Sequence, residues 1–357
     1  MKQAPAIASI RSLTSLALPG EQLIPALLEA LHRVIPSSRN LFDWTDADGN
    51  LIRYYFEGPI DAEVARHYFE EFHNKRESEA MPAFRQAVTG RAVIRSAAEL
   101  DNAAFFRSAL YNEIWRPQRL HTRIEAIVKS SRGDPLGSLV LYREPGDPPF
   151  TRDEEALLAS LVPYIARGLE GGSRLPQAFV ARRERRAILS LSVEGELLHV
   201  SRDAHKLLLL AHGGITPESA SRDPEYSQFP TLGVLVDQIR RNDGASSRQV
   251  AFTIDNAWGR FVFEAEPLLA ASARDGAIHV SIEHLEPAPI AWQRALDGSG
   301  LTIAQKEVCT LLKAGYSQPE IAAALSVAPS TVADHVKKIY ARLDVHSVRE
   351  LCERLAG

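Results

Sequence analysis

Residues 301–357, LTIAQKEVCTLLKAGYSQPEIAAALSVAPSTVADHVKKIYARLDVHSVRELCERLAG, decide the fold of the C-terminal end of this chain. Thr302, Ser317 and Ser347 are each followed three residues later by Gln or Glu, which makes three capping boxes. In a capping box the hydroxyl and the later side chain satisfy free N–H groups where a helix begins. Gly315 suits the left-handed residue that ends the first helix. The stretch therefore predicts four short amphipathic helices, the middle two with helix-turn-helix spacing.

The third of these helices, expected over 330–343, has one apolar face and one polar face. Val332, Ile339 and Leu343 recur at helical spacing and are expected to be buried. In the other helices the same spacing predicts a buried set: Val308, Leu311, Leu312, Ile321, Ala324, Leu325, Leu351 and Leu355. The opposite face of the third helix carries Ala333, Asp334, Lys337, Lys338 and Ala341. A DNA major groove is wide enough to admit such a helix.

This segment resembles the LuxR-type helix-turn-helix domain of bacterial transcription regulators. The residues that carry the resemblance are Leu301, Thr302, Glu307, Val308, Leu311, Leu312, Gly315, Ser317, Glu320, Ile321, Ala322, Leu325, Thr331, Val332 and His335. The resemblance implies that the third helix reads the groove, the second braces against phosphate and the fourth contributes to a dimer interface. The DNA-binding residues that it implies are Ser317, Gln318, Ser330, Thr331, Ala333, Asp334, Lys337, Lys338 and Tyr340.

The segment also departs from the family pattern on the groove-facing side. Ala333 stands where the family has a lysine, and Asp334 follows it. Residues 300–357 hold seven Lys and Arg against six Asp and Glu, which is a small positive balance for a DNA-binding module. An alternative is therefore a module that uses the fold for protein contact and has weak or no specific DNA binding. Retention on non-specific DNA at several salt concentrations separates the two hypotheses, because phosphate contacts are salt-dependent.

Length and composition are those of an ordinary multidomain protein. The chain has 357 residues, 45% of them hydrophobic and 24% charged, and its net charge is −4. That length suffices for two or three domains with their own cores. No apolar run approaches the ~20 residues needed to cross a bilayer, and the N-terminus does not have the pattern of a cleaved signal peptide. We therefore expect a cytoplasmic protein with no membrane partner.

Residues 1–170 are expected to form an α+β domain. Helices are predicted over 21–35, 61–74, 103–115 and 151–169, the last opened by a capping box at Thr151 and Glu154. Two pairs of strands are predicted, 40–45 with 51–57 and 121–129 with 136–142. The order of these elements resembles a GAF-type sensor domain.

Residues 171–186 contain a break, GGSRLP, and a basic run, ARRERR, and are expected to be a linker. For the basic run a solvated linker or helix face is favoured over a second nucleic-acid patch. A hairpin over 187–201, helices near 202–211 and 232–241, and strands at 247–254, 259–267 and 277–285 follow. This order over 187–287 resembles a PAS-type domain. A helical connector within 288–299 is expected to join it to the DNA-binding domain at 300–357.

Sensor domains of this kind usually present an apolar pocket for a small ligand, or a dimer surface. The candidate ligand-binding residues are Phe105, Phe106, Tyr111, Trp115 and His121, for which a plain core role is the alternative. The cofactor is unknown, and no zinc-type Cys/His spacing indicates a metal site. His67 and His73 are six residues apart and point to different faces of a helix.

The chain has two cysteines, Cys309 and Cys352, both in the C-terminal segment. Each occupies a position where the family has an aliphatic residue, so both are expected to be small core residues. A redox pair is the alternative, and it requires Cα atoms about 4.4–6.8 Å apart.

No catalytic motif is present: the chain has neither a P-loop nor a G-x-S-x-G elbow, and we predict no enzyme activity. The fold class predicted is multidomain α+β, with GAF-like and PAS-like units before an all-α four-helix LuxR-type domain. The function predicted is a one-component transcriptional regulator that binds promoter DNA as a homodimer under control of its sensory domains. Its expected partners are double-stranded DNA, a second copy of the chain, a small-molecule effector and RNA polymerase.

Overall fold

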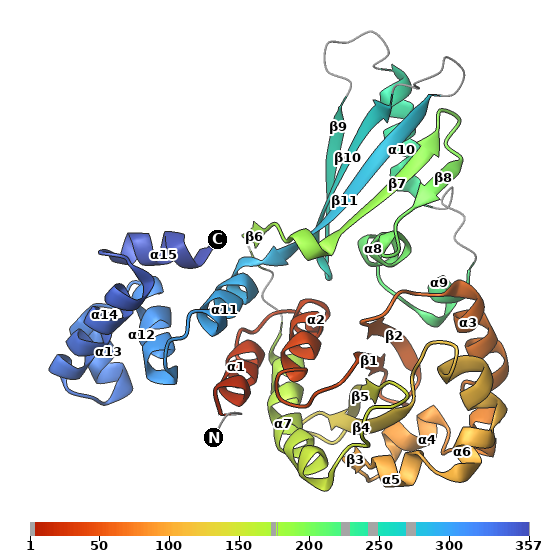
Figure 1. Cartoon of the computed structure of the whole chain (residues 1–357), viewed down its shortest axis with the longest axis horizontal. Coiled ribbons are helices and arrows are strands. Elements are labelled where there is room, and N and C mark those ends of the chain that lie inside the picture. The colour runs from red at the N-terminus through yellow and green to blue at the C-terminus, as the bar shows by residue number, and fades with distance from the viewer. Residues whose placement is uncertain are drawn as a thin grey trace.

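The computed structural model of the chain describes residues 4–172, 176, 178–222, 229–241, 249–268 and 276–356. It contains two antiparallel sheets followed by a helical C-terminal end, so the predicted fold class is confirmed. In Figure 1 the first sheet lies at the lower right, the second sheet above it, and the C-terminal helices at the left. We call residues 4–172 the N-terminal unit, residues 178–287 the central unit and residues 300–356 the C-terminal module.

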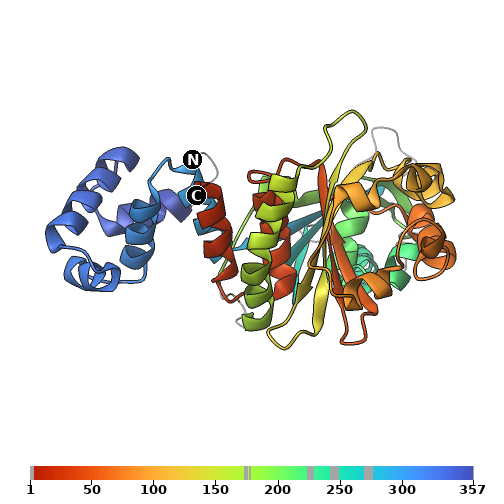
Figure 2. The same cartoon turned by 90° about the horizontal axis from the view of Figure 1, so that it is seen from below.

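The sheet of the N-terminal unit has the strand order β2-β1-β5-β4-β3. Its strands are β1 (Arg39–Thr45), β2 (Leu51–Phe56), β3 (Ile94–Arg95), β4 (Thr122–Lys129) and β5 (Pro135–Arg143). Helices cover both faces, as Figure 2 shows. On one face lie α1 (Ala4–Thr14), α2 (Gly20–Leu31) and α7 (Arg152–Gly171). On the other lie α3 (Ala62–His67), η1 (Tyr68–Phe72), η2 (Arg76–Glu79), α4 (Phe84–Thr89), α6 (Ala103–Arg107) and η3 (Leu110–Trp115). The short helix α5 (Ala97–Leu100) contacts α7, because Ala97 is buried in the core of the first face and its N–H donates to Glu155.

The two faces of this sheet differ in chemistry because side chains alternate along each strand. Phe42, Leu139 and Ile124 point toward α1, α2 and α7 and are fully buried in an apolar core. The residues next to them, Asp43, Ser138 and Glu125, are also buried, on the face toward the other helices. The sheet therefore has one side that is mainly apolar, with Asn40 donating to the Leu28 carbonyl of α2, and one side with a buried polar strip.

The sheet of the central unit repeats the same topology, with the order β8-β7-β11-β10-β9. Its strands are β7 (Arg186–Ser192), β8 (Leu197–Val200), β9 (Val250–Asn256), β10 (Gly259–Leu268) and β11 (Ala277–Pro287), and β6 (Phe179–Val180) pairs with the end of β11. The helices of this unit are η4 (Arg183–Arg185), α8 (Ala204–Ala211), α9 (Pro217–Ser221) and α10 (Pro230–Arg241). Alternate residues of β7, β10 and β11 are buried, as expected for a sheet with one covered face.

The N-terminal and central units share one hydrophobic core. The Trp258 ring packs edge-on against Trp44 at 5.6 Å and stacks on Tyr55 at 6.0 Å. Lys206 places its ammonium 4.3 Å from the centre of the Tyr55 ring and donates to the backbone carbonyl of Phe56. The two units are therefore held together by aromatic packing and by a buried cation.

The C-terminal end consists of α11 (Ala288–Gly298), α12 (Ile303–Lys313), α13 (Gln318–Leu325), α14 (Pro329–Leu343) and α15 (Val348–Ala356). The four helices expected in residues 301–357 are therefore present. The capping boxes at Thr302, Ser317 and Thr151 are formed. At Ser347 the hydroxyl accepts from the Glu350 N–H at 3.1 Å. Gly315 has φ +88°, which is the left-handed conformation expected after α12.

Several local predictions were wrong. No helix was expected over Ala4–Thr14, where α1 packs against α2, α7 and α11. The helix expected over 103–115 is broken at Ser108, which has an extended backbone (φ −70°, ψ 155°). The segment expected to be a helix over 61–74 is α-helical only as far as His67. From Tyr68 to Phe72 it forms the π-helical turn η1. The expected break at 171–176, the loop before Pro230 and the strand start at Ser247 lie partly outside the described residues.

The interval 171–186, expected to be a linker, contains the β6 strand and η4. Arg182, in its basic run, is 20% exposed at its side chain and pairs with Glu29 of α2, so it is not part of a solvated face. Within the described ranges, no helix combines the length and hydrophobicity that crossing a bilayer requires.

Candidate nucleic-acid interface

Helix α14 is fixed in the C-terminal module by one buried face. Val332, Val336 and Ile339 are buried there, at the three- and four-residue spacing of a helix face. Val336 was not among the residues expected in the core. Ala324 was expected to be buried but is exposed; Ala322 is buried in its place on α13. The prediction was wrong by half a turn because α13 has eight residues, too few to define its inner face by periodicity.

The turn between α13 and α14 is closed by backbone contacts. Ser326 ends α13 in the left-handed conformation, with φ +54°. The Val327 N–H then donates to the Ala322 carbonyl at 3.0 Å. Ala328 is the N-cap of α14 and contributes no side-chain hydrogen bond, as its methyl group dictates. Pro329 occupies the first helical turn, where its missing N–H is not needed.

The outward face of the helix pair carries most of the residues expected to contact DNA. Ser317, Gln318, Ser330, Thr331, Ala333, Asp334, Lys337 and Lys338 are exposed. Tyr340 differs, because its ring is partly buried against the core of the module and burial raises the pKa of its hydroxyl. The arrangement leaves a polar helix face open to a groove-sized partner, with Tyr340 at its border.

Charge on this face is partly neutralised within α14 itself. Lys338 Nζ lies 2.6 Å from Asp334 Oδ2, one helical turn away. The hydrogen bond from Lys338 and its positive charge lower the pKa of Asp334. Both side chains are more than half exposed, so the pair adds little to stability. Lys337 forms no ion pair with any described residue, and its charge is available to a phosphate or a base edge.

The two cysteines of the module are free thiols. Cys309 is fully buried in the module core, and burial raises the pKa of its thiol to about 12. Cys352 is partly buried against the same core. A thiol with so high a pKa holds almost no thiolate near neutral pH, so Cys309 is a poor nucleophile.

Helix α11 belongs to two cores at once. Ile290 is buried in the apolar core formed by α1, α2 and α7. Less than two turns later, Trp292 and Leu296 are buried in the core of the C-terminal module. The Lys313 ammonium of α12 lies 4.0 Å from the centre of the Trp292 ring. Because α11 follows β11 directly, it connects the central unit, the N-terminal unit and the module (Figure 1).

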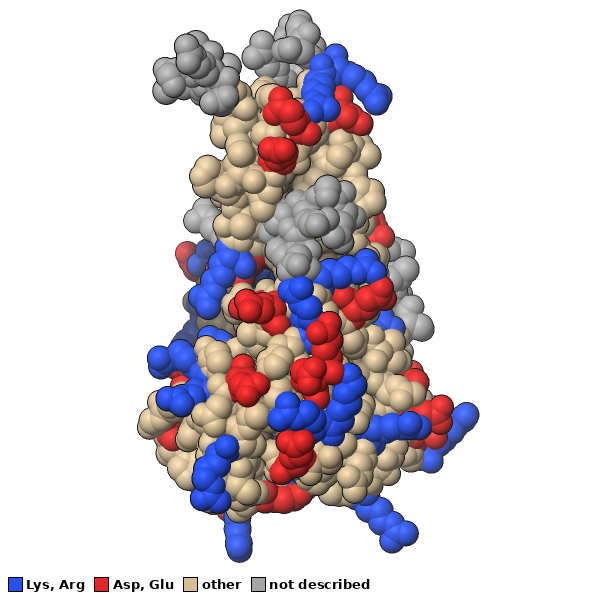
Figure 3. Space-filling model, turned by 90° about the vertical axis from the view of Figure 1, so that its right-hand side faces the viewer, with Lys and Arg blue, Asp and Glu red and all other residues tan. Residues whose placement is uncertain are grey.

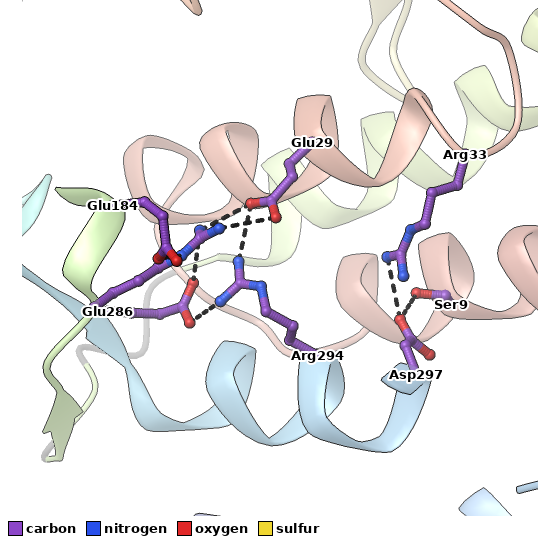
Figure 4. Close-up of polar contacts among 8 residues, drawn as sticks. Ser9, Glu29, Arg33, Glu184, Glu286, Arg294 and Asp297 are labelled. Carbon is purple, nitrogen blue, oxygen red and sulfur yellow. Dashed lines mark hydrogen bonds and ion pairs between the residues drawn. The ribbon is translucent and has the colours of Figure 1, made fainter. Parts of the chain in front are cut away.

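Asp297, near the end of α11, accepts hydrogen bonds from its own helix and from three other segments. Its side chain is 5% exposed. Oδ1 accepts from Lys306 Nζ of α12 at 2.9 Å and from Gln293 at 3.2 Å. Oδ2 accepts from Ser9 of α1 and from Arg33, which follows α2, as Figure 4 shows. One carboxylate therefore links α1 and α2 to the first helix of the C-terminal module.

A second ionic cluster lies at the beginning of α11 (Figure 4). Arg182 makes a two-pronged contact with Glu29, with N–O distances of 2.9 and 3.0 Å. Arg294 reaches Glu29 at 3.0 Å and also donates to Glu286 at the end of β11. Burial raises the pKa of Glu29, but the two guanidinium groups outweigh it and the pKa is lowered. The cluster joins α2, β11 and α11 by charge-assisted hydrogen bonds, which are the stronger kind.

On the side that faces away from the C-terminal module, the described residues of the N-terminal unit form no region of one charge sign. Figure 3 shows Lys and Arg interspersed with Asp and Glu over the N-terminal unit on that side. A surface with both signs interspersed does not concentrate phosphate groups.

A cavity lies between the first sheet and the helices α3 and η1. It has a volume of about 130 Å³ and is partly open to solvent. Of the five residues expected to bind a ligand, Trp115 lies on its wall, whereas Phe105, Phe106, Tyr111 and His121 are not among the described residues that line it. These four contact one another instead. Phe106 stacks on His121 at 4.7 Å, and Tyr111 Oη lies 2.7 Å from His121 Nδ1.

Asp43 lines the cavity and was missed in the sequence. Its signal is an acidic residue inside the run Arg39–Thr45, at a position where alternation requires an inward side chain. The sequence could have flagged it as a buried polar residue.

One comparison with known proteins identifies the family of the C-terminal module. Residues 299–355 match the family model GerE, described as bacterial regulatory proteins of the luxR family. The C-terminal module is thus a LuxR-type helix-turn-helix domain, as expected. No curated protein matches the chain.

Solved structures match it at low identity. They include a phage VqmA–DPO complex, at 17% identity over 48% of this chain and 83% of that one, with a TM-score of 0.22. The Vibrio cholerae VqmA dimer matches at 14% identity over 47% and 80%, with a TM-score of 0.20. The N-terminal part of DhaR with DhaL, from E. coli, matches at 14% identity over 77% and 87%, with a TM-score of 0.25.

Proposed function

We propose that this chain is a one-component transcriptional regulator that binds promoter DNA through α14. The observation that carries the proposal is a LuxR-type module whose third helix presents an open polar face. An α-helix of this kind fits a major groove, with its side chains against base edges and its flanks against phosphates.

The residues divide by role on that face. Lys337, with no ion pair to a described residue, is proposed to contact a base edge or a phosphate. Thr331, Lys338 and Gln318 are proposed to contact the phosphate backbone, which fixes the register of the helix. Asp334 is proposed to accept from a cytosine amino group, a contact that acidic residues make in the major groove.

The remaining units are proposed to control when DNA is bound. In this proposal the chain divides into a GAF-like domain (1–170), a PAS-like domain (187–287) and the DNA-binding domain (300–357), joined by residues 171–186 and 288–299. In this proposal α11 transmits the signal to the DNA-binding domain. Its Ile290 lies in the core of the N-terminal unit, and its Trp292 and Leu296 lie in the core of the C-terminal module. A movement of α1 or α2 changes the donors around Asp297 and thereby the position of Lys306 at the start of the module.

The protein is further proposed to act in the cytoplasm as a homodimer, on half-sites related by two-fold symmetry. Contact with RNA polymerase remains a prediction of the resemblance to LuxR-type regulators.

The salt dependence of binding tests whether the module binds DNA at all. The full chain is titrated with a non-specific duplex at several salt concentrations. We expect log K to fall linearly with log salt, with a slope of about −0.9 for each phosphate neutralised. Replacing Lys337 with Ala should reduce that slope by about one.

A second function is favoured by one observation, the presence of Asp334 on a face with few net charges. In that case the module contacts a protein instead. A flat salt dependence, or no retention at low salt, supports the adaptor and contradicts the regulator.

A further inference from the structure

The cavity of the N-terminal unit combines an apolar, ring-rich wall with acidic polar groups. Three elements supply most of the rings, since Tyr54 comes from β2, Tyr68 from η1 and Trp115 from η3. No Lys or Arg is among the described residues that line it, whereas Asp43 and Asp61 are. At about 130 Å³ the space is comparable with the ~150 Å³ engineered cavity that holds benzene. Its size therefore suits a ligand built on a single ring or a branched chain.

Asp43 is the buried acid that this wall leaves without a partner. It lies on β1 between Tyr54 of β2 and Ser138 of β5, and its residue is 8% exposed. Its carboxyl group accepts no hydrogen bond from any described residue. A buried carboxyl group without a hydrogen-bond partner destabilises the folded protein. The presence of Asp43 at a buried strand position therefore needs an explanation.

The two other buried acids on this side of the sheet are fully engaged. Glu77 accepts from the Tyr68 hydroxyl at 2.5 Å and from the backbone N–H groups of Asn74 and Phe84 at 2.9 and 3.0 Å. Glu125 accepts from Arg95 at 2.7 Å and from Ser138 at 2.6 Å. The contrast shows that the fold supplies partners for buried acids here, and that Asp43 faces the cavity instead.

The electrostatics of the cavity select the sign of a partner. Burial, and then the nearby charges of Glu125 and Glu77, raise the pKa of Asp43 well above its ordinary range. A cation entering the cavity relieves both effects, because it pairs with the carboxylate and offsets the neighbouring charges. The faces of Tyr and Trp rings attract the same cation. An anionic ligand is disfavoured by the charges of Asp43, Glu125 and Glu77.

We propose that this cavity binds a small molecule with a ring-sized apolar body and one protonated amino group, the ammonium donating to Asp43 and the body lying among the aromatic side chains. The role of this molecule as the effector of the regulator rests on the function proposed above. Its binding in the cavity does not depend on that function.

The binding test uses the full chain and four probes of similar size at neutral pH: benzylammonium, cyclohexylammonium, benzyl alcohol and benzoate. Affinity is measured by isothermal titration calorimetry and checked by the ligand-induced shift of the melting temperature. We expect both ammonium probes to bind at least tenfold more tightly than benzyl alcohol, and benzoate not to bind.

Two variants locate the site. Asp43→Asn keeps the shape and removes the charge, so it should weaken the ammonium probes at least tenfold and leave benzyl alcohol unchanged or tighter. Ala65→Leu, on the α3 side of the cavity, fills space and keeps Asp43, so it should weaken every probe. Asp134→Asn, in an exposed turn, is the matched control for a lost carboxylate and should bind like the parent chain.

Three results overturn the proposal: no ammonium probe binds, benzyl alcohol binds as tightly as benzylammonium, or Asp43→Asn leaves ammonium binding unchanged. A gel shift with and without benzylammonium separates this proposal from the function proposed above. If benzylammonium binds to the chain but does not change its affinity for DNA, only the proposed effector role is contradicted. If the chain binds DNA but binds none of the ammonium probes, only the ligand proposal is contradicted and the proposed function stands.

Discussion

Lys337 carries the sharpest prediction at the scale of single residues. Its ammonium forms no ion pair with a described acidic group, whereas that of Lys338 pairs with Asp334. Replacing Lys337 with Ala should weaken binding to a specific duplex by about 1–3 kcal/mol, since one base or phosphate contact is lost. A gel shift at fixed salt measures the change.

Arg349→Ala is the control for this substitution. Arg349 lies on α15, is 87% exposed at its side chain and pairs with Glu353, so the same unit of charge is lost away from α14. The DNA affinity of the Arg349→Ala variant should stay within about threefold of that of the parent chain. Equal losses in the two variants mean that α14 is not the reading helix.

Asp43 makes a prediction about stability and pH. Its pKa is raised in the folded state above the unfolded value of 3.8, so the folded protein holds a proton that the unfolded chain releases. Folding stability therefore falls as pH rises from about 4 through the folded pKa. Asp43→Asn should raise the free energy of unfolding at pH 7.5 by roughly 1–3 kcal/mol.

The check is urea denaturation of both proteins at pH 7.5 and near pH 4. The advantage of the variant should shrink at the lower pH, where the carboxyl group is protonated in the folded state and about half protonated in the unfolded chain. A variant that is less stable than the parent at both pH values means that the carboxyl has a partner in solution.

At the residue scale the sequence predicts what depends on near neighbours. Thr302 with Gln305 and Thr151 with Glu154 form the expected capping boxes, because each box is complete within four residues. The lone position of Asp43 could not be predicted in this way. It depends on Tyr54, Ser138 and Glu77, which strand pairing and a distant turn bring around it.

At the scale of elements, the errors have local physical causes. Ser108 ends α6 because its hydroxyl donates to the Phe105 carbonyl at 2.6 Å and accepts from the Tyr111 N–H at 3.1 Å. Such side-chain bonds compete with the helical ladder. Helix α1 was missed because it has no capping signal, and packing against α2, α7 and α11 holds it. Tertiary contacts of this kind cannot be predicted from the spacing of apolar residues along the sequence.

Helix α11 yields the prediction at this scale. Asp297→Ala removes the acceptor for Lys306, Ser9 and Gln293, and an unsatisfied buried group costs about 1–3 kcal/mol. We expect faster amide hydrogen exchange in α1, α11 and the first turn of α12. The central strands β4 and β5 should exchange as in the parent chain, because they lie outside this cluster.

Asp147→Ala serves as the control, since its carboxylate is exposed and lies in a turn of the N-terminal unit. Unchanged exchange in all three helices of the Asp297 variant contradicts a coupling role for α11.

At the scale of the whole molecule, three units are joined through shared side chains rather than through loops. Trp258 ties the central unit to the N-terminal unit, and Ile290 with Trp292 ties both to the module. A linker was expected over 171–186, where Arg182 instead binds Glu29. The fold class followed from the order of elements, but these connections did not, since each joins residues far apart in the chain.

The assembly prediction belongs to this scale too. Native mass spectrometry of the full chain mixed with a specific duplex should give two copies of the chain per duplex. Half-sites should lie about one helical turn apart, as two-fold symmetry requires. A one-to-one complex at saturation contradicts the homodimer.

The central claim is that α14 selects particular DNA sequences, and a specificity ratio tests it most directly. Genomic fragments retained by the full chain are selected, and affinity for one of them is compared with that for a shuffled duplex of equal length, at one salt concentration near physiological strength. The account predicts a preference of about 10³-fold or more, reduced by Lys337→Ala. Equal affinity for both duplexes contradicts it.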